Sequence, residues 1–589
     1  MLGNYLEWLD YEPEEYHSFK NIRDSFHLSA AIYGTAIPLV FGSGKVNGKI
    51  IWADQIKEVE QIKTEKRYFS NSKQTKALYH VYEYEYYLSF ALAICEGEIA
   101  EISRVWTNND LINLGEYKFR LYHGSEEQMP DPLITSASEG GQAPAFRGLA
   151  YIVFENLPLI DFGNIIPTFS FEVIRKANVP KIFSVEDLVK SMVMIPGSGE
   201  FVYDTIIQHK VITNSYGASI ARKVINCHNY HNISNSLHSL NQLNLTCSNI
   251  EWVAPVVCWF GDSLNAADCA IKPAVEYNDL TTKYTEEWHV GGYTRRTAKL
   301  ISRDQDEKPR YGGSVNDASV VRYLQELQAR SIKIMFYPMF FVDIERKPWR
   351  GHVTGDPAII SEFFNKEEGY NNFILHYAKL VKDNVNAFVI GSELIGLTSI
   401  RAGDSSFPAV IELVKLAKLV KEIVGPNILG TYAADWSEYH HTHGGWYNLD
   451  PLWSSPYIDF IGIDAYFPVT SSTSSVILQS EIIKGWKSGE GYDYFIDSNS
   501  IKQPLSPEYA WKNLKYWWET PHYNPDGART GWFPQMKKFW FTEFGFPSID
   551  KATNQPNVFL TLFVVMEGFQ DILRVRLTFP SNAKPLEPL

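Results

Sequence analysis

The segment Ala387–Leu394 (AFVIGSEL) is an apolar run that meets a carboxylate, Glu393, near its end. A second segment of the same kind, Phe539–Gly545 (FWFTEFG), carries Glu543, 150 residues further along the chain. Short apolar runs bounded by glycine and polar residues are typical of buried strands in a parallel sheet. In β/α barrels the catalytic side chains lie at the carboxyl ends of such strands. We therefore expect both carboxylates at the same end of a barrel.

Two carboxylates on non-adjacent strands can face each other across a cleft, which is the arrangement that glycoside hydrolysis requires. For Glu393 or Glu543 alone, a helix cap or an ion pair with an arginine is an equally good explanation, because unusual carboxylates indicate function only probabilistically. The pair together, in this strand order, favours catalysis.

Length and composition restrict the possible classes of protein. A chain of 589 residues is too long for one core and predicts two to four domains. Aromatic residues make up 14% of the chain, with 16 Trp, and both sugar rings and protein interfaces use aromatic faces. The net charge of −14 argues against nucleic acid as a partner, because phosphate binding requires a basic surface.

The cysteines indicate neither a disulfide framework nor a zinc site, because they are odd in number and include no CxxC pair. We expect buried free thiols in a protein made in the cytoplasm. The first residues, Met1–Glu7, lack the basic start and apolar core of a signal peptide, and no segment is long enough to cross a membrane. The five cysteines are Cys95, Cys227, Cys247, Cys258 and Cys269.

The first 240 residues are predicted to be a β-rich structural region without a catalytic constellation. Asn47-Gly48 is a strong hairpin signal between two β-prone segments. One helix is expected from a cap at Ser184 to Met192. Residues 226–249 are rich in Asn, Ser and His, and we interpret them as a polar linker at a domain boundary. The histidines of this segment suggest a metal site, but no spacing of ligands supports one: His228, His231 and His238.

From Ile250 onward, predicted strands alternate with predicted helices, which indicates a parallel sheet with crossover helices. Glu393 belongs to the fourth predicted strand and Glu543 to the seventh. We predict a (β/α)8 barrel over residues 241–559 that ends before its eighth unit, followed by an atypical tail at 560–589. The predicted strands are 253–260, 287–293, 332–342, 387–394, 428–434, 458–466 and 539–545.

This layout resembles that of the large clan of retaining (β/α)8 glycoside hydrolases. The chain resembles more closely the baseplate or tail-tip proteins of gene transfer agents and related phages, which contain a glycoside-hydrolase-like barrel. In the barrel the resemblance is carried by 254–262 (APVVCWFGD), 311–320 (YGGSVNDASV), 348–356 (PWRGHVTGD), 390–398 (IGSELIGLT), 432–439 (YAADWSEY) and 540–546 (WFTEFGF). In the first half it is carried by 129–134 (MPDPLI), 146–158 (FRGLAYIVFENLP) and 162–173 (FGNIIPTFSFEV).

The resemblance to the hydrolase clan implies that Glu393 is the acid/base and Glu543 the nucleophile. Retention would require the two carboxyl groups to lie about 5–5.5 Å apart. Tyr466, at the end of the sixth predicted strand, either orients the nucleophile or serves packing. The clan usually has Asn before the acid/base, whereas this chain has Ser392. We expect weaker contacts to the sugar from the shorter hydroxyl.

Further residues at strand ends are candidates for binding a sugar. Four of them could contact sugar hydroxyls or, equally well, form salt bridges across the barrel: Asp343, Arg350, Asp435 and Asp464. Three tryptophans could stack on sugar rings, although each is more often a core residue: Trp259, Trp349 and Trp436. No metal or nucleotide motif is present, so we expect no metal and no cofactor.

Together these features predict a baseplate component of a phage-like particle whose barrel cleaves peptidoglycan or another envelope or surface polysaccharide. The alternative is a catalytically inactive structural, receptor-binding or glycan-binding baseplate protein. Ser392 and the absent eighth unit favour the alternative, whereas the two Glu residues favour the enzyme. An ordinary cytoplasmic glycosidase leaves the β-rich half unexplained. The expected partners are other tail proteins and envelope carbohydrate, with assembly into a particle after synthesis in the cytoplasm.

Overall fold

The computed structural model describes residues 34–68, 75–176, 185–196, 199–213, 219–229, 231–279, 282–403, 405–471, 476–497, 499, 501–547, 549 and 551–557. The chain divides into two compact units, one of Met1–Pro180 with Cys227–Ile233 and one of Lys181–Asn226 with Ser234–Leu589. The predicted tail at 560–589 lies outside the described residues. All five cysteines are buried and free, as expected from their spacing.

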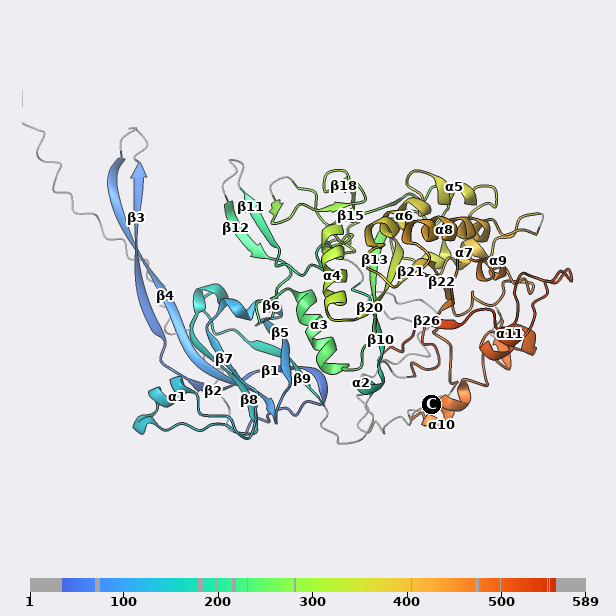
Figure 1. Cartoon of the computed structure of the whole chain (residues 1–589). Coiled ribbons are helices and arrows are strands. Elements are labelled where there is room, and N and C mark those ends of the chain that lie inside the picture. Colours follow the sequence, from blue (N-terminus) through green and yellow to red (C-terminus); the bar gives the residue numbers. More distant parts are fainter. Residues whose placement is uncertain are drawn as a thin grey trace, which may run out of the picture. The chain divides into compact units, whose positions relative to one another are not determined.

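The first unit is rich in strands, which confirms the prediction for this part of the chain, and it contains two antiparallel sheets (Figure 1). One sheet has the order β1 (Gly42–Asn47), β9 (Phe169–Arg175), β5 (Glu101–Thr107) and β6 (Asp110–Ile112). The other has the order β2 (Lys49–Ala53), β4 (Thr75–Glu96), β8 (Leu149–Pro158) and β7 (Phe119–Tyr122), with β3 (Lys57–Tyr68) paired to β4.

Stacked phenylalanines link the two sheets of this unit into one core. Phe154 of β8 stacks on Phe169 of β9 with ring centroids 4.6 Å apart, so side chains from both sheets share one core. The hairpin predicted at Asn47-Gly48 is wrong, because β1 and β2 belong to different sheets. A Cβ at Gly48 would lie 2.9 Å from the ring of Phe171. Close packing therefore explains the glycine.

The second unit contains a nearly closed barrel of seven strands in which every neighbouring pair is parallel (Figure 1). This confirms the predicted fold class. Among the described residues no strand pairs with both ends of this path. In order, the strands are β10 (Ser191–Met194), β13 (Trp252–Gly261), β20 (Lys333–Val342), β21 (Ala387–Ser392), β22 (Leu429–Asp435), β23 (Ile461–Asp464) and β26 (Phe539–Glu543).

Three sequence predictions in this unit are wrong. The segment expected to form the second barrel strand, 287–293, instead contributes to the small hairpin of β17 (His289–Val290) and β18 (Tyr293–Thr294). The helix expected to reach Met192 is only α2 (Val185–Leu188), and Met192 lies in β10. Within the predicted polar linker, residues Asn235–Thr246 form helix α3. Its Leu240 and Leu243, three positions apart, are buried and hold the helix against the core.

Side chains alternate between the interior of the barrel and its outer surface. On β20, Met335, Tyr337 and Met339 belong to the interior cluster. Ile334 and Phe336, between them in sequence, belong to the larger core that includes the helices. This period of two is the reason why the strands are apolar on both faces.

The predicted crossover helices are present as α4 (Asp317–Ala329), α6 (Tyr370–Val381) and α8 (Pro408–Val424). Figure 1 shows α6 and α8 beside the strands β21 and β22. Their apolar rows, such as Leu413, Leu416 and Val420 of α8, are buried in the outer core. In the described residues, none of the helices has the length and apolar character needed to span a bilayer.

We expect Phe388→Ala to lower the free energy of unfolding by about 3–5 kcal/mol, because it removes a ring that is fully buried in the outer core. The matched control is Phe541→Ala on β26, since that ring is 44% exposed and should cost much less. Urea unfolding followed by tryptophan fluorescence measures both losses. Equal losses would contradict this arrangement of the barrel wall.

Candidate active site

Four carboxyl groups lie at the carboxyl ends of neighbouring barrel strands. Glu393 directly follows β21, Asp435 ends β22, Asp464 ends β23 and Glu543 ends β26. All four are buried. Because the strands are parallel and adjacent, the ends of the strands bring together residues that are up to 150 positions apart in the sequence.

Glu393 is held by two donors from the loop after β20. Trp349 Nε1 donates to Glu393 Oε2 at 2.6 Å, and the Arg350 guanidinium lies 2.8 Å from the same oxygen. Arg350 Nε also donates to the carbonyl of Ser392 at 3.1 Å. A guanidinium beside a carboxylate forms a charge-assisted hydrogen bond. Both donors are directed at the same oxygen of Glu393, which fixes the side chain.

The backbone at Glu393 is unusual, with φ at +50°. A residue with a side chain rarely adopts this left-handed conformation, and its cost must be offset by the surroundings. Glu393 N donates to the carbonyl of Ala433 at 2.9 Å, which fixes the turn against β22.

Glu543 accepts a hydrogen bond from Tyr466 Oη at 2.7 Å through Oε2. Its other oxygen, Oε1, is buried and makes no hydrogen bond with the part of the chain that the structure describes. Burial and the nearby charge of Glu393 raise the pKa of Glu543, while Arg350, Tyr466 and Tyr337 act in the opposite direction. Glu543 thus has one oxygen that is positioned and one that is unused.

Asp464 is level in the strand register with Asp435 and Glu543, and it is fully buried. It accepts hydrogen bonds from Tyr337 Oη and Thr542 Oγ1, both at 2.8 Å. Burial, followed by the charges of Glu543 and Glu393, raises its pKa well above the ordinary value. A neutral, hydrogen-bonded Asp464 avoids the cost of an additional buried charge.

Asp435 is the neighbour of Glu393 on the next strand. Its Oδ1 accepts from the backbone N–H and the hydroxyl of Ser437, at 2.9 and 2.5 Å. Burial and the charge of Glu393 raise the pKa of Asp435 to about 7, although the Ser437 hydrogen bonds lower it. Asp435 is therefore able to hold a proton close to Glu393 near neutral pH.

The other predicted site residues have different surroundings. Asp343 accepts from Lys299 Nζ and Ser302, so its oxygens are engaged in an ion pair and hydrogen bonds. Trp259 is fully buried against α6, with its ring stacked on His376. The structure does not place Asp343 or Trp259 in the cluster of four carboxyl groups. Trp436 lies in an aromatic group with Phe467 and Trp511. Ser392 Oγ is buried and has no partner among the described residues.

Sequence reasoning did not identify Tyr337, Thr542 and Glu438 as part of this region. Tyr337 is the one hydroxyl-bearing residue of the apolar strand β20, and Thr542 immediately precedes Glu543. These are weak signals, because isolated Tyr and Thr are common in strands. Glu438 lies three positions after Asp435, in a turn where a structural role is the simplest expectation.

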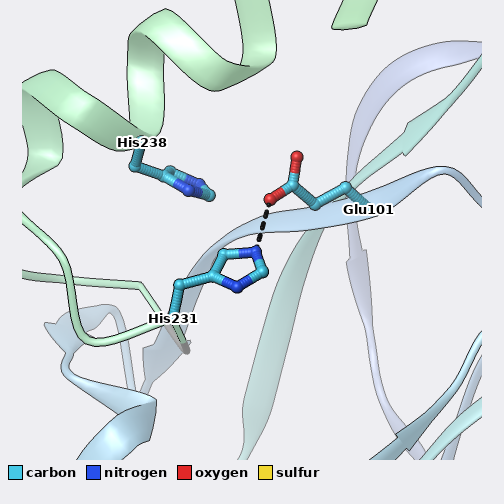
Figure 2. A group of neighbouring side chains, drawn as sticks. All are labelled: Glu101, His231 and His238. Atoms are coloured by element: carbon cyan, nitrogen blue, oxygen red, sulfur yellow. Dashed lines mark hydrogen bonds and ion pairs between the residues drawn. The ribbon is translucent and has the colours of Figure 1, made fainter.

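Two histidines of the predicted linker, His231 and His238, have hydrogen-bonding partners. In the first unit His231 Nε2 lies 3.0 Å from Glu101 Oε1, and Figure 2 shows this pair. His238 belongs to the second unit, where its Nε2 is hydrogen-bonded to Gln242 at 3.0 Å. Each of the two histidines thus has a partner within its own unit.

Comparison with known protein families finds a match in the barrel region. Residues 368–563 match the family described as the GTA TIM-barrel-like domain. The chain contains a GTA TIM-barrel-like domain. This confirms the resemblance to a gene transfer agent protein with such a domain. No curated protein matches the chain.

Solved structures also match the chain. One is from the virion of a native gene transfer agent particle, with 35% identity and a TM-score of 0.21, covering 29% of this chain and 34% of that chain. Another is a GH113 β-1,4-mannanase with 16% identity and a TM-score of 0.24, covering 40% and 57%. A third is the GH113 β-mannanase from Alicyclobacillus acidocaldarius, with 14% identity and a TM-score of 0.25, covering 52% and 81%. The chain thus spans about a third of the virion protein that it matches.

We expect Asp435→Asn to change how stability depends on pH. The pKa of Asp435 is about 7 in the folded protein, above the value of about 3.9 for a free side chain, so the folded protein binds more protons between these values. Wild-type stability should therefore fall relative to the variant as pH rises from about 4 to about 7, by at most about 4 kcal/mol, and stay level above that.

The measurement is the unfolding temperature of both proteins between pH 4 and pH 9. Asp383→Asn, which removes an exposed carboxylate after α6, is the control and should run parallel to the wild type. If the curve of Asp435→Asn also ran parallel to that of the wild type, the pKa of Asp435 would not differ between the folded and unfolded states.

Proposed function

We propose that this chain is a baseplate component of a gene-transfer-agent-like particle, and that its barrel hydrolyses a polysaccharide of the cell envelope or surface with retention of configuration. The particle role is supported by the GTA TIM-barrel-like domain at residues 368–563. Peptidoglycan is the first substrate to test, because a particle that delivers its contents must pass through the envelope. Other tail proteins are the expected protein partners.

The observation that carries the hydrolytic proposal is the convergence of Glu393 and Glu543 at the carboxyl ends of β21 and β26, with Tyr466 bound to Glu543. The charge of Glu393 contributes to the raised pKa of Glu543, so the two groups interact electrostatically. A pair of carboxyl groups with different surroundings is what acid and nucleophile roles require.

The reaction would proceed in two steps. Glu543 attacks the anomeric carbon through an oxygen that Tyr466 leaves unbound, and the bond from that carbon to the leaving oxygen breaks. Glu393 gives its proton to the leaving oxygen. In the second step Glu393 takes a proton from water, and the hydroxide displaces Glu543 from the sugar. Two inversions at the same carbon give retention.

A second candidate function, glycan binding without hydrolysis, is favoured by two contacts to one oxygen of Glu393. Arg350 and Trp349 both lie against Oε2 of Glu393. Both donors occupy this oxygen, whereas a general acid must present a proton to the leaving group. Hydrolysis therefore requires the substrate to displace a donor, and Asp435, with a pKa of about 7, is the adjacent group that can hold a proton.

The test is the release of new reducing ends from peptidoglycan and from surface polysaccharide by the full chain. We expect Glu543→Gln to abolish release and Glu393→Gln to lower it about 10²–10⁴-fold, because general acid–base catalysis contributes that much. Glu422→Gln, which changes an exposed carboxylate on α8, is the control and should retain activity.

Each outcome separates the two candidates. Loss of release in both site variants, with the control active, supports hydrolysis. A folded wild-type protein that binds these polysaccharides in a pull-down assay but releases no reducing ends supports the binding function. A protein that neither binds nor cleaves them would remove both proposals for the barrel.

A further inference from the structure

Glu438 is a buried carboxyl group that has no part in the reaction proposed above. It lies in the turn after β22, and only 2% of its surface is exposed. Its backbone N–H donates to the carbonyl of Asp435 at 2.8 Å, which closes the turn. An acidic residue at this depth is rare unless its oxygens are hydrogen-bonded.

Both oxygens of Glu438 are hydrogen-bonded. Oε1 accepts from Thr398 Oγ1 at 2.5 Å and from Tyr432 Oη at 2.9 Å. Oε2 accepts from the backbone N–H of Asp435 at 3.1 Å. One donor comes from α7 (Ile395–Thr398) and two come from β22, while Glu438 itself lies in the turn after β22. One carboxyl group thus ties three segments together at the carboxyl end of the barrel.

This network reaches Glu393 in two steps. The backbone N–H of Leu394, the residue after Glu393, donates to Tyr432 Oη at 2.7 Å, and Tyr432 in turn donates to Glu438. The same carboxyl group binds the backbone of Asp435 directly. The left-handed backbone of Glu393 therefore has fixed contacts on its C-terminal side as well as at its own N–H.

In the structure both oxygens of Glu438 act as acceptors, and burial raises the pKa of this carboxyl group to about 8. Three donors point at two oxygens, and a carboxylate has lone pairs for all of them. Glutamine at position 438 has nearly the same shape, but its NH2 group would replace one acceptor with a donor. If its oxygen faced Tyr432 and Thr398, its NH2 group would face the N–H of Asp435, donor against donor.

We propose that Glu438 is a positioning residue that sets the backbone of both Glu393 and Asp435, through Tyr432 to the first and by a direct hydrogen bond to the second. It contacts no substrate, because both of its oxygens are engaged and the side chain is buried. Its effect on turnover rests on the proposed function, whereas its effect on the two backbone segments does not.

The first experiment measures hydrogen exchange by mass spectrometry in the full chain, with peptides that resolve Leu394 and Asp435. In Glu438→Gln we expect the exchange rate of both amides to rise about tenfold, the effect of losing a hydrogen bond at each site. Tyr432→Phe, which removes only the hydroxyl, should raise exchange at Leu394 and leave the amide of Asp435 unchanged.

The matched control is Glu412→Gln on α8. Glu412 is also buried, and it accepts from Ser361 Oγ at 3.0 Å and from Asn365 Nδ2 at 2.9 Å. Like Glu438 it is a buried carboxyl group with both oxygens hydrogen-bonded, in another part of the second unit, and it also pairs with Lys415 at 2.8 Å. This variant should leave the amides of Leu394 and Asp435 at the wild-type rate, even where its overall stability falls.

The second experiment separates positioning from simple loss of stability. If the barrel releases reducing ends, Glu438→Gln should lower kcat at least tenfold with KM within about twofold of the wild type, since no substrate contact is lost. Tyr432→Phe should lower kcat in the same direction and by less. Glu412→Gln should retain the wild-type kcat at a temperature where it is folded.

Unchanged exchange at both amides in folded Glu438→Gln would overturn the proposal, and so would an equal rise in Glu412→Gln. If Glu438→Gln does not fold, Tyr432→Phe decides: unchanged exchange at Leu394 overturns the proposal, and a selective rise supports it. A wild type without hydrolytic activity would refute the proposed function alone, because the exchange results decide the role of Glu438 independently.

Discussion

The site depends on how four buried carboxyl groups share one end of a barrel around the guanidinium of Arg350. Four ionised carboxylates could not be buried together, because desolvation and mutual repulsion would each cost several kcal/mol per charge. Arg350 pairs with Glu393, and burial together with neighbouring carboxylate charge raises the pKa of Asp435, Asp464 and Glu543. The charge of Glu393 thus raises the pKa of each of the other three carboxyl groups.

The fold could be predicted where the sequence itself carried the signal. Strands such as β20 and β21 are apolar on both faces, because one face fills the barrel and the other packs on helices, and their order placed Glu393 and Glu543 correctly at strand ends. β10 could not be predicted in the same way. It has four residues, and its place in the sheet is decided by pairing with β13, a contact of high sequence separation.

The candidate site could be predicted only in its residue types. Asp343 and Asp435 both end or follow apolar strands, so the pattern alone cannot distinguish them. The structure separates them through their partners: Lys299 and Ser302 engage Asp343, whereas Asp435 faces the charge of Glu393. Partners of this kind come from loops, and loop conformation has no period in the sequence that could reveal it.

The contacts around Glu393 are compatible with hydrolysis or with binding alone, depending on what the substrate does to them. A general acid needs a carboxyl group that presents its proton to the leaving oxygen, whereas Arg350 and Trp349 both occupy Oε2 of Glu393. A sugar that displaced either donor would open that oxygen to a proton, with Asp435 beside it as the source. Catalysis would then depend on substrate binding to change the protonation of the site. Glu438 would keep the donor and acceptor of that proton in place, because it fixes the backbone of Asp435 and, through Tyr432, the backbone next to Glu393.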